Sequence, residues 1–243
     1  MSKNKESEVG SLRQMASGQI SNPASIWDER YSGEEYHFGT EPNAFLVSQQ
    51  SLLKPGMSCL AVADGEGRNG VWLAEQGLDV LSVDSSSVAL EKARQLAQKR
   101  GVTDGTTSHL TRLSNYASQV IGYAKCEQVD LMQWSWGENR FDVVAAIFIQ
   151  FAPPGMREQM FAHIKCCLKP GGLLLLQGYT PRQLHYGTGG PSQAENLYTE
   201  TLLREAFADM EIIELREHDD IISEGAGHSG MSALIDLVAR KPG

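Results

Sequence analysis

The chain alternates between short apolar runs and longer segments with helical periodicity. The runs Phe141–Phe148 and Leu173–Leu176 are almost continuously apolar, as expected for parallel strands that are buried on both faces. The helical segments between the runs open at serine or proline and close near glycine. Such an alternation is typical of an α/β fold. We predict strands at about 57–63, 79–83, 141–148, 173–176, 210–216 and 231–239, with one more before Asp130, and helices at about 43–53, 67–76, 85–99, 153–168 and 199–208.

Other segments lack this pattern. Residues 1–22 are polar and rich in Ser, Gln, Lys and Glu, a composition typical of a flexible tail. We therefore predict a flexible tail over 1–22 and a single domain over 23–243. Residues 102–124 have no clear period, and we assign them no function. Residues 180–197 form a polar, glycine-rich loop, and a second polar loop is expected between the last two strands.

The first predicted strand ends in the glycine turn Gly65-Glu66-Gly67-Arg68-Asn69-Gly70, and the second ends in Asp84. Strand, glycine turn, helix, strand and acid form the layout of a nucleotide-binding half-fold. The turn fits G-x-G-x-x-G, so an NAD-type oxidoreductase is one interpretation. Asp64 and Glu66 flank the turn, however, and carboxylates repel a pyrophosphate. S-Adenosylmethionine carries a sulfonium and an ammonium group but no phosphate, so these acids favour it over a dinucleotide.

Composition and charge exclude several classes of protein. The chain has 243 residues, 41% of them hydrophobic, and a net charge of −9, which argues against nucleic acid or an anionic membrane as partner. No apolar run approaches the roughly 20 residues that span a bilayer, and the N-terminal residues lack the apolar core of a signal peptide. The four cysteines have no C-x-x-C spacing. We therefore expect no metal, reduced thiols and a cytoplasmic location.

Several motifs occur in a fixed order along the chain. In this order they resemble the class I S-adenosylmethionine-dependent methyltransferases, and within them the small bacterial group that includes the tellurite-resistance and thiopurine methyltransferases. The likeness covers about Ile26 to Pro242. The motifs that carry it are Trp27-Asp28-Glu29-Arg30-Tyr31, Phe38-Gly39-Thr40-Glu41-Pro42, Asp64-Gly65-Glu66-Gly67-Arg68-Asn69, Val83-Asp84, Asp130-Leu131, Leu168-Lys169-Pro170-Gly171-Gly172 and the loop Gly178–Pro191.

This resemblance implies a doubly wound, mostly parallel seven-stranded sheet with an antiparallel C-terminal hairpin, and S-adenosylmethionine as cofactor. By this resemblance, the glycine turn faces the methionine end of the cofactor and Asp84 binds the ribose. Asp130 and Leu131 contact the adenine, and residues 147–151 form the wall under the sulfonium. Motifs and resemblance together give these cofactor-binding candidates: Tyr31, Asp64, Gly65, Gly67, Arg68, Asn69, Asp84, Ser85, Asp130, Leu131, Ile147 and Phe151.

The chain departs from the family pattern at two positions. The acid that opens the family's glycine motif falls on Ala61, and the first glycine falls on Ala63. We expect Asp64 to supply the missing negative charge.

Some of these residues also have plainer interpretations. The spacing of Trp27, Tyr31 and Tyr36 is compatible with one face of a helix packed on the core, whereas a ring of Tyr31 beside a sulfonium would gain cation–π attraction. Asp84 is a candidate ligand of the ribose hydroxyls. Its plainer interpretation is a cap of the next helix, a role that the serines after it also suit. We favour the ribose.

The methyl acceptor has candidate ligands in two loops. Arg182, His185 and Tyr186 lie in the long loop 180–197, and long glycine-rich loops in compact domains are often lids. His228 lies in the loop expected between the last two strands, at the cofactor edge of the sheet. With Tyr36 these residues are the substrate candidates, and a solvated loop is the plainer interpretation.

Methyl transfer from a sulfonium is an in-line displacement in which the enzyme mainly aligns the reacting atoms and excludes water. A thiolate or a chalcogen oxyanion needs no general base, and no histidine or acid is placed by the sequence as one. We therefore predict an S-adenosylmethionine-dependent methyltransferase with a small, soft acceptor. The alternatives are an NAD-type oxidoreductase and a non-catalytic S-adenosylmethionine-binding protein.

Overall fold

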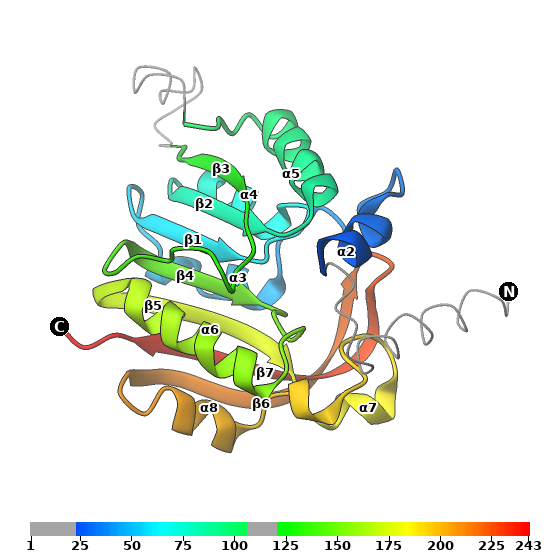
Figure 1. Cartoon of the computed structure of the whole chain (residues 1–243), viewed down its shortest axis with the longest axis vertical. Helices are drawn as coiled ribbons and strands as arrows, with labels where there is room; N and C mark the ends of the chain where they lie inside the picture. The colour runs from blue at the N-terminus through cyan, green and yellow to red at the C-terminus, as the bar shows by residue number, and fades with distance from the viewer. Residues whose placement is uncertain (1–22, 106–120) are drawn as a thin grey trace, which may run out of the picture.

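A computed structural model describes residues 23–105 and 121–243 (Figure 1). It contains a seven-stranded sheet with the order β3-β2-β1-β4-β5-β7-β6. Neighbouring strands are parallel except at β7, which runs antiparallel to both β5 and β6. The strands are β1 Ser58–Val62, β2 Asp79–Asp84, β3 Tyr123–Gln128, β4 Phe141–Ile147, β5 Leu168–Tyr179, β6 Glu211–Glu224 and β7 His228–Arg240. The predicted doubly wound fold with an antiparallel C-terminal hairpin is confirmed.

Helices cover both faces of the sheet, α6 and α8 on one and α3, α4 and α5 on the other (Figure 1). None of the helices in the described ranges is long and apolar enough to cross a membrane. The helices are α2 Pro23–Tyr31, α3 Ala44–Ser48, α4 Arg68–Glu75, α5 Ser87–Lys99, α6 Pro154–Cys167, α7 Gln183–Tyr186 and α8 Glu200–Ala206, with 3-10 turns at Gln50–Leu52 and Ala194–Asn196.

Strand β4 explains why the central strands are continuously apolar. Val144 and Ala146 pack into the core under α6 and α8, whereas Val143, Ala145 and Ile147 pack into the core under α3 and α4. Because successive side chains point to opposite faces, a strand covered on both faces has no polar side. The central strands could therefore be recognised from the sequence.

The order of the strands reverses between β1 and β4. Chain connections leave β1 toward β2 on one side, while β4 and β5 lie on the other. Open α/β sheets bind their ligands at the carboxyl ends of the strands that flank such a point. The glycine turn follows β1, Asp84 ends β2, and Phe148 follows β4, so all three lie at this edge.

The predicted polar loop between the last two strands is wrong. Residues 217–224 and 228–230 belong to β6 and β7, which pair from Glu211↔Arg240 to Glu224↔His228 around a three-residue turn at 225–227. His218 and His228 therefore lie in strands. Since β6 is an edge strand, much of it is exposed, and its run Glu217-His218-Asp219-Asp220 has no apolar face to mark it as a strand.

The sequence also predicts a flexible tail over 1–22 and a loop over 180–197. The predicted flexible tail lies wholly outside the described residues, as does most of the segment 102–124. The predicted loop 180–197 contains α7 and the 3-10 turn Ala194–Asn196, so it is more ordered than a polar, glycine-rich composition indicates.

Ala63 follows β1 with a backbone φ of +48°, at the position where the family pattern has its first glycine. A non-glycine residue in the left-handed region is strained by its Cβ. We expect Ala63→Gly to stabilise the protein by about 0.5–1 kcal/mol, because the lost strain exceeds the added freedom of glycine in the unfolded chain. Thermal unfolding should show a rise of about 1–4 °C in Tm. Ala61→Gly is the matched control: Ala61 is buried inside β1, where glycine lowers stability, and a fall in Tm in both variants would contradict the assignment of strain to Ala63.

Candidate active site

The two glycines of the turn are required by its conformation and by its neighbours. Gly65 and Gly67 have φ values of +58° and +84°. A Cβ on Gly67 would lie 2.6 Å from the Cβ of Ala93 in α5, and one on Gly65 would lie 2.8 Å from the hydroxyl of Tyr31. The turn is therefore pressed between helix α5 and an aromatic ring of α2.

Asp84 is buried at the end of β2 and is bound to the glycine turn. One carboxylate oxygen accepts from the backbone N–H of Gly65 and the other from that of Ser86, each at 2.9 Å. Burial raises the pKa of this carboxyl, and the backbone donors oppose the rise. An ionised carboxylate has about four acceptor positions, so Asp84 keeps capacity for a hydroxyl donor. The cap of helix α5 is Ser86, which accepts from the N–H of Ala89.

Asp64, which we expect to supply the negative charge that Ala61 lacks, lies three residues after it, just beyond the end of β1. Its carboxylate accepts from the Ser82 hydroxyl at 2.7 Å and from the N–H of Gly70 at 3.2 Å. Gly70 lies in the first turn of α4, whose free N–H groups would receive a pyrophosphate in a dinucleotide site. Burial raises the pKa of Asp64 to about 7. A carboxylate at this helix end opposes dinucleotide binding.

Glu66, in contrast, does not offer a free charge to the turn. Its side chain is buried, is paired with Lys92 at 2.8 Å, and accepts from the N–H of His37 at 2.7 Å. Glu66 thereby ties the segment after α2 to the glycine turn.

A small cleft of about 10 Å³ lies between the carboxyl ends of β1 and β4. Asp64, Asn69 and Ile147, three of the predicted cofactor-binding residues, line it together with Val62, Ala63 and Ala145. The cleft is at the point where the strand order reverses. Sequence motifs that are up to about 85 positions apart are brought together there.

Five aromatic rings surround this edge of the sheet. Phe148, directly after β4, has a φ of +56° and lies 4.6 Å from the ring of His228 and 4.7 Å from that of Tyr179, between centroids. Phe38 contacts His228 at 4.5 Å and Tyr31 at 6.2 Å. The rings thus form a continuous wall from the glycine turn to the hairpin.

Two buried hydroxyls lie at the end of β5, one on Tyr179, which belongs to the wall, and one on the next residue, Thr180. Those of Tyr179 and Thr180 have no hydrogen-bond partner in the part of the chain that the structure describes, although Ser232 lies close to Tyr179. Burial raises the pKa of Tyr179, so its hydroxyl stays neutral and can donate. Buried polar groups without partners commonly belong to ligand sites.

The tip of the β6–β7 hairpin closes the site from the other side. Arg68, which we predicted as a cofactor ligand, pairs with Glu224 at 2.7 Å, and Glu224 also accepts from the amide of Asn43 at 3.0 Å. The N–H of Gly227 donates to the carbonyl of His37 at 3.1 Å. The N-terminal segment and the hairpin therefore meet over the carboxyl edge of the sheet.

A buried chain of polar side chains fixes this closure to the sheet. Asn43 donates to Gln177 at 2.7 Å, and Gln177 donates to Asp236 at 2.6 Å. Asp236 in turn binds Arg216 and His218 of β6. These contacts join residues of the N-terminal segment, β5, β7 and β6.

The family model for thiopurine S-methyltransferase matches residues 23–240. The chain belongs to this family. It is an S-adenosylmethionine-dependent methyltransferase, as the sequence predicts. A comparison with the curated proteins found no match.

Solved structures share the fold of this methyltransferase. One, from work on the conversion of a disulfide bond into a thioacetal group during echinomycin biosynthesis, is 18% identical with a TM-score of 0.67 and covers 90% of this chain and 92% of its own. TehB from Haemophilus influenzae is 16% identical with a TM-score of 0.60, and the match covers 90% of this chain and 66% of TehB. N-Methyltransferase NodS from Bradyrhizobium japonicum WM9, in complex with S-adenosyl-L-homocysteine, is 12% identical with a TM-score of 0.61. The match covers 90% of this chain and 98% of the NodS chain.

Nine of the twelve predicted cofactor residues do not line the cleft, and four of these nine also take no part in the contacts of the glycine turn and its closure described above. Asp130 is exposed, and its carboxylate accepts from Met132 and Gln133 in the turn after β3. Leu131 is buried in the core under α6, and Phe151 packs against the same core. The carbonyl of Ser85 accepts from Gln128. Their roles toward the cofactor stay predictions that rest on the resemblance.

The substrate candidates of the methyltransferase separate into two groups. His228 is part of the aromatic wall, whereas Tyr36 donates its hydroxyl to the carbonyl of Lys92 in α5. Arg182 and Tyr186 both bind Asp219 in β6, and His185 is exposed on α7. Arg182 and Tyr186 therefore anchor α7 to the hairpin, while Gly189, Gly190 and Leu197 of the same loop lie next to Tyr179.

The aromatic wall includes two residues that the sequence did not single out as ligands, Phe38 and Tyr179, and Phe148, which lies within the range 147–151 that the resemblance assigns to the wall under the sulfonium. Phe148 and Tyr179 lie at the carboxyl ends of predicted strands, which is a usable signal, because ligands of α/β sheets bind at those ends.

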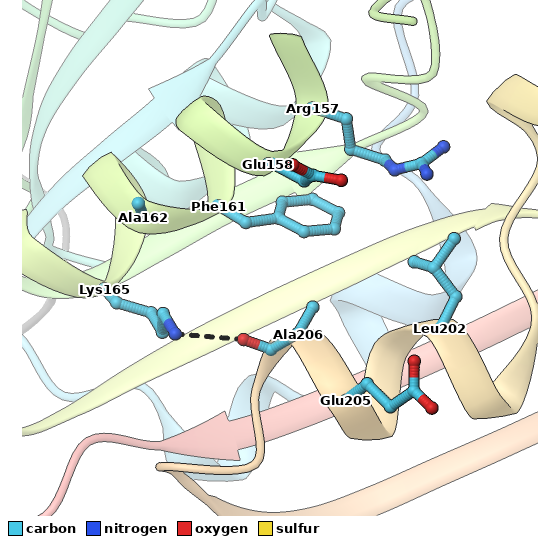
Figure 2. A pocket seen from close by; sticks show the side chains of 8 residues that line it. All are labelled: Arg157, Glu158, Phe161, Ala162, Lys165, Leu202, Glu205 and Ala206. Atoms are coloured by element: carbon cyan, nitrogen blue, oxygen red, sulfur yellow. Dashed lines mark hydrogen bonds between the residues drawn. The ribbon is translucent and has the colours of Figure 1, made fainter. Parts of the chain in front are cut away.

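A larger groove of about 340 Å³ lies elsewhere, between α6 and α8 (Figure 2). Phe161 and Leu202 lie toward its floor, while Lys165 donates to the carbonyl of Ala206 across it. None of the glycine-turn residues lines this groove. This groove is therefore separate from the candidate site at the carboxyl edge of the sheet.

Proposed function

We propose that the methyltransferase transfers its methyl group to a small, soft nucleophile, a thiol or a chalcogen oxyanion. The observation that carries this proposal is the aromatic wall of Phe38, Phe148, Tyr179 and His228, which meets the glycine turn at Tyr31. Aromatic rings attract polarisable sulfur, and the same holds for the heavier chalcogens.

Fit to the cofactor is supported by the donors and acceptors left at the edge of the sheet. Asp84 keeps acceptor capacity for a ribose hydroxyl, and Asp64 offers negative charge at the cleft beside Asn69. S-Adenosylmethionine supplies an activated methyl group on a positively charged sulfur. The rings of Tyr31 and Phe148 favour a positive charge nearby through cation–π attraction.

The protein's own task is to align the acceptor and to exclude water. The closure of the hairpin tip on the N-terminal segment, through Arg68–Glu224 and Gly227–His37, serves both purposes. The buried hydroxyls of Tyr179 and Thr180 provide polar contacts for the acceptor.

We expect S-adenosylhomocysteine to stabilise the protein against heat and NAD to leave it unchanged, because Asp64 occupies the helix end that a pyrophosphate needs. At a hundred times the dissociation constant, binding adds about 2.7 kcal/mol, a rise of about 5–10 °C in Tm. Differential scanning fluorimetry with each compound measures the effect. A shift with NAD alone would contradict the arrangement of the site.

The acceptor itself is identified by a methyl-transfer screen with isotope-labelled cofactor. Thiols, tellurite, selenite and small amines are offered in parallel, and product formation is counted. We expect label in the sulfur or chalcogen products. Transfer to the amines alone would contradict the proposed acceptor class, and cofactor binding without any transfer would support a non-catalytic binding protein.

A further inference from the structure

His228 is held in a fixed orientation by a partner that is itself fixed. It is the first residue of β7, and its side chain is 9% exposed. Its Nδ1 lies 3.5 Å from a carboxylate oxygen of Glu224, across the three-residue hairpin turn. Glu224 is in turn bound by Arg68 at 2.7 Å and by Asn43 at 3.0 Å. A histidine oriented by an anchored carboxylate is an arrangement used for general bases.

The second ring nitrogen of His228 points away from this partner. When Nδ1–H donates to Glu224, Nε2 carries the free lone pair. Nε2 makes no hydrogen bond with any residue in the described part of the chain. The ring itself lies against Phe38, Phe148 and Tyr179, so the lone pair is located within the aromatic wall.

The charges around the pair favour a neutral histidine beside an ionised glutamate. Burial lowers the pKa of His228, and Arg68 and Arg30 lower it further, while Glu224 opposes them. Burial alone would raise the pKa of Glu224, but the hydrogen bond with His228 and the charge of Arg68 bring it to about 2. A second histidine nearby, His37, packs its ring against Phe38 and Tyr31. At neutral pH, His228 is therefore able to accept a proton.

We propose that His228 is the proton acceptor for a neutral thiol acceptor bound at the aromatic wall. This inference rests on the proposed function and adds to it a catalytic residue and a range of substrates. The S–H proton moves to Nε2, and the sulfur lone pair forms the new bond to the methyl carbon as the bond from that carbon to the sulfonium breaks. The products are a methyl thioether, S-adenosylhomocysteine and a protonated His228, which then releases its proton to solvent.

The substrate range follows from the acidity of the acceptor. Alkyl thiols are mostly protonated at neutral pH, since the free thiol of cysteine has a pKa of about 8.5, and they need a base. Acidic aryl thiols are already thiolates and do not. The two classes of thiol therefore distinguish a base from a residue that only shapes the site.

The test compares His228→Asn with the wild type on 2-mercaptoethanol and on 4-nitrobenzenethiol. Asparagine keeps a donor near Glu224 but removes Nε2. We expect kcat/KM of the variant for 2-mercaptoethanol to fall about a hundredfold or more, the size of a general-base contribution. The activity of the variant should recover as the pH approaches the pKa of the thiol, because the thiolate then forms without a base. With 4-nitrobenzenethiol, the fall should be less than about tenfold.

Glu224→Gln provides a second variant. It should also lose more activity with 2-mercaptoethanol than with 4-nitrobenzenethiol, but less than His228→Asn does, because glutamine still orients the imidazole ring of His228 and no longer stabilises the protonated ring. Binding of S-adenosylhomocysteine, measured by calorimetry, controls for folding and cofactor affinity in both variants. Equal losses with the two thiols would overturn the role of His228. A wild type that methylates neither thiol but does methylate amines would instead refute the proposed acceptor class.

Discussion

Replacing Asp84 with alanine is expected to weaken binding of S-adenosylhomocysteine about ten- to a hundredfold, since hydrogen bonds to a charged group contribute about 1.5–3 kcal/mol. The carboxylate is buried at the end of β2 and has acceptor positions left after binding Gly65 and Ser86. Isothermal titration calorimetry gives the dissociation constant, and circular dichroism with thermal unfolding checks the fold.

The matched control for Asp84 is Asp28→Ala. Asp28 accepts from the Ser86 hydroxyl at 2.6 Å and from the N–H of Val88, so it supports the same helix end without facing the glycine turn. A loss of affinity confined to Asp84→Ala identifies a ribose ligand. Equal losses in both variants, or none in Asp84→Ala, would mean that Asp84 only supports the turn and the start of α5.

Cofactor affinity is expected to depend on pH through Asp64. Its pKa of about 7 means that the carboxyl is mostly protonated at about pH 5.5 and ionised at about pH 8. A bound cationic group favours the ionised form, so binding releases a proton in the acidic range. The affinity for S-adenosylhomocysteine should therefore rise with pH, by at most about tenfold per unit, and level off above about pH 7.

Asp64→Asn isolates this effect from other titrating groups, including His228 and Asp84. The amide oxygen still accepts from Ser82 or Gly70, so the turn keeps its support. We expect the variant to bind more weakly at about pH 8 and to lose most of the pH dependence between about pH 5.5 and 7. An identical pH profile in variant and wild type would exclude Asp64 from contact with the charge of the ligand.

The central strands could be predicted because a strand that is buried on both faces is a continuous run of apolar residues in the sequence. Strands β1, β2, β4 and β5 are apolar runs that end in glycine, acid or aromatic residues, and the observed bounds differ from the predicted ones mainly at the ends. Strand β6 could not be recognised beyond its first half. An edge strand that projects past the sheet has no buried face for the residues 217–220, so its polar pattern is that of a loop.

The candidate site could be predicted in part for a different reason. Gly65, Gly67 and Asp84 are local features, each set by a turn or a strand end. The contacts of His228, Glu224 and Arg68 depend on pairing across the hairpin and on its approach to α4, which no local pattern encodes. Arg68 was predicted as a cofactor ligand from its motif alone, and its observed partner lies 156 positions away.

The long-range contacts of the closure also fix when the site can form during synthesis. Asn43 reaches Gln177 and Glu224 over 134 and 181 positions, and Arg68 reaches Glu224 over 156. The glycine turn and strands β1 and β2 are made early, but Gln177 and Glu224, which complete the closure, leave the ribosome much later. A nascent chain is therefore unable to complete its cofactor site until the hairpin has emerged, and the open edge of the sheet is left to solvent and chaperones until then.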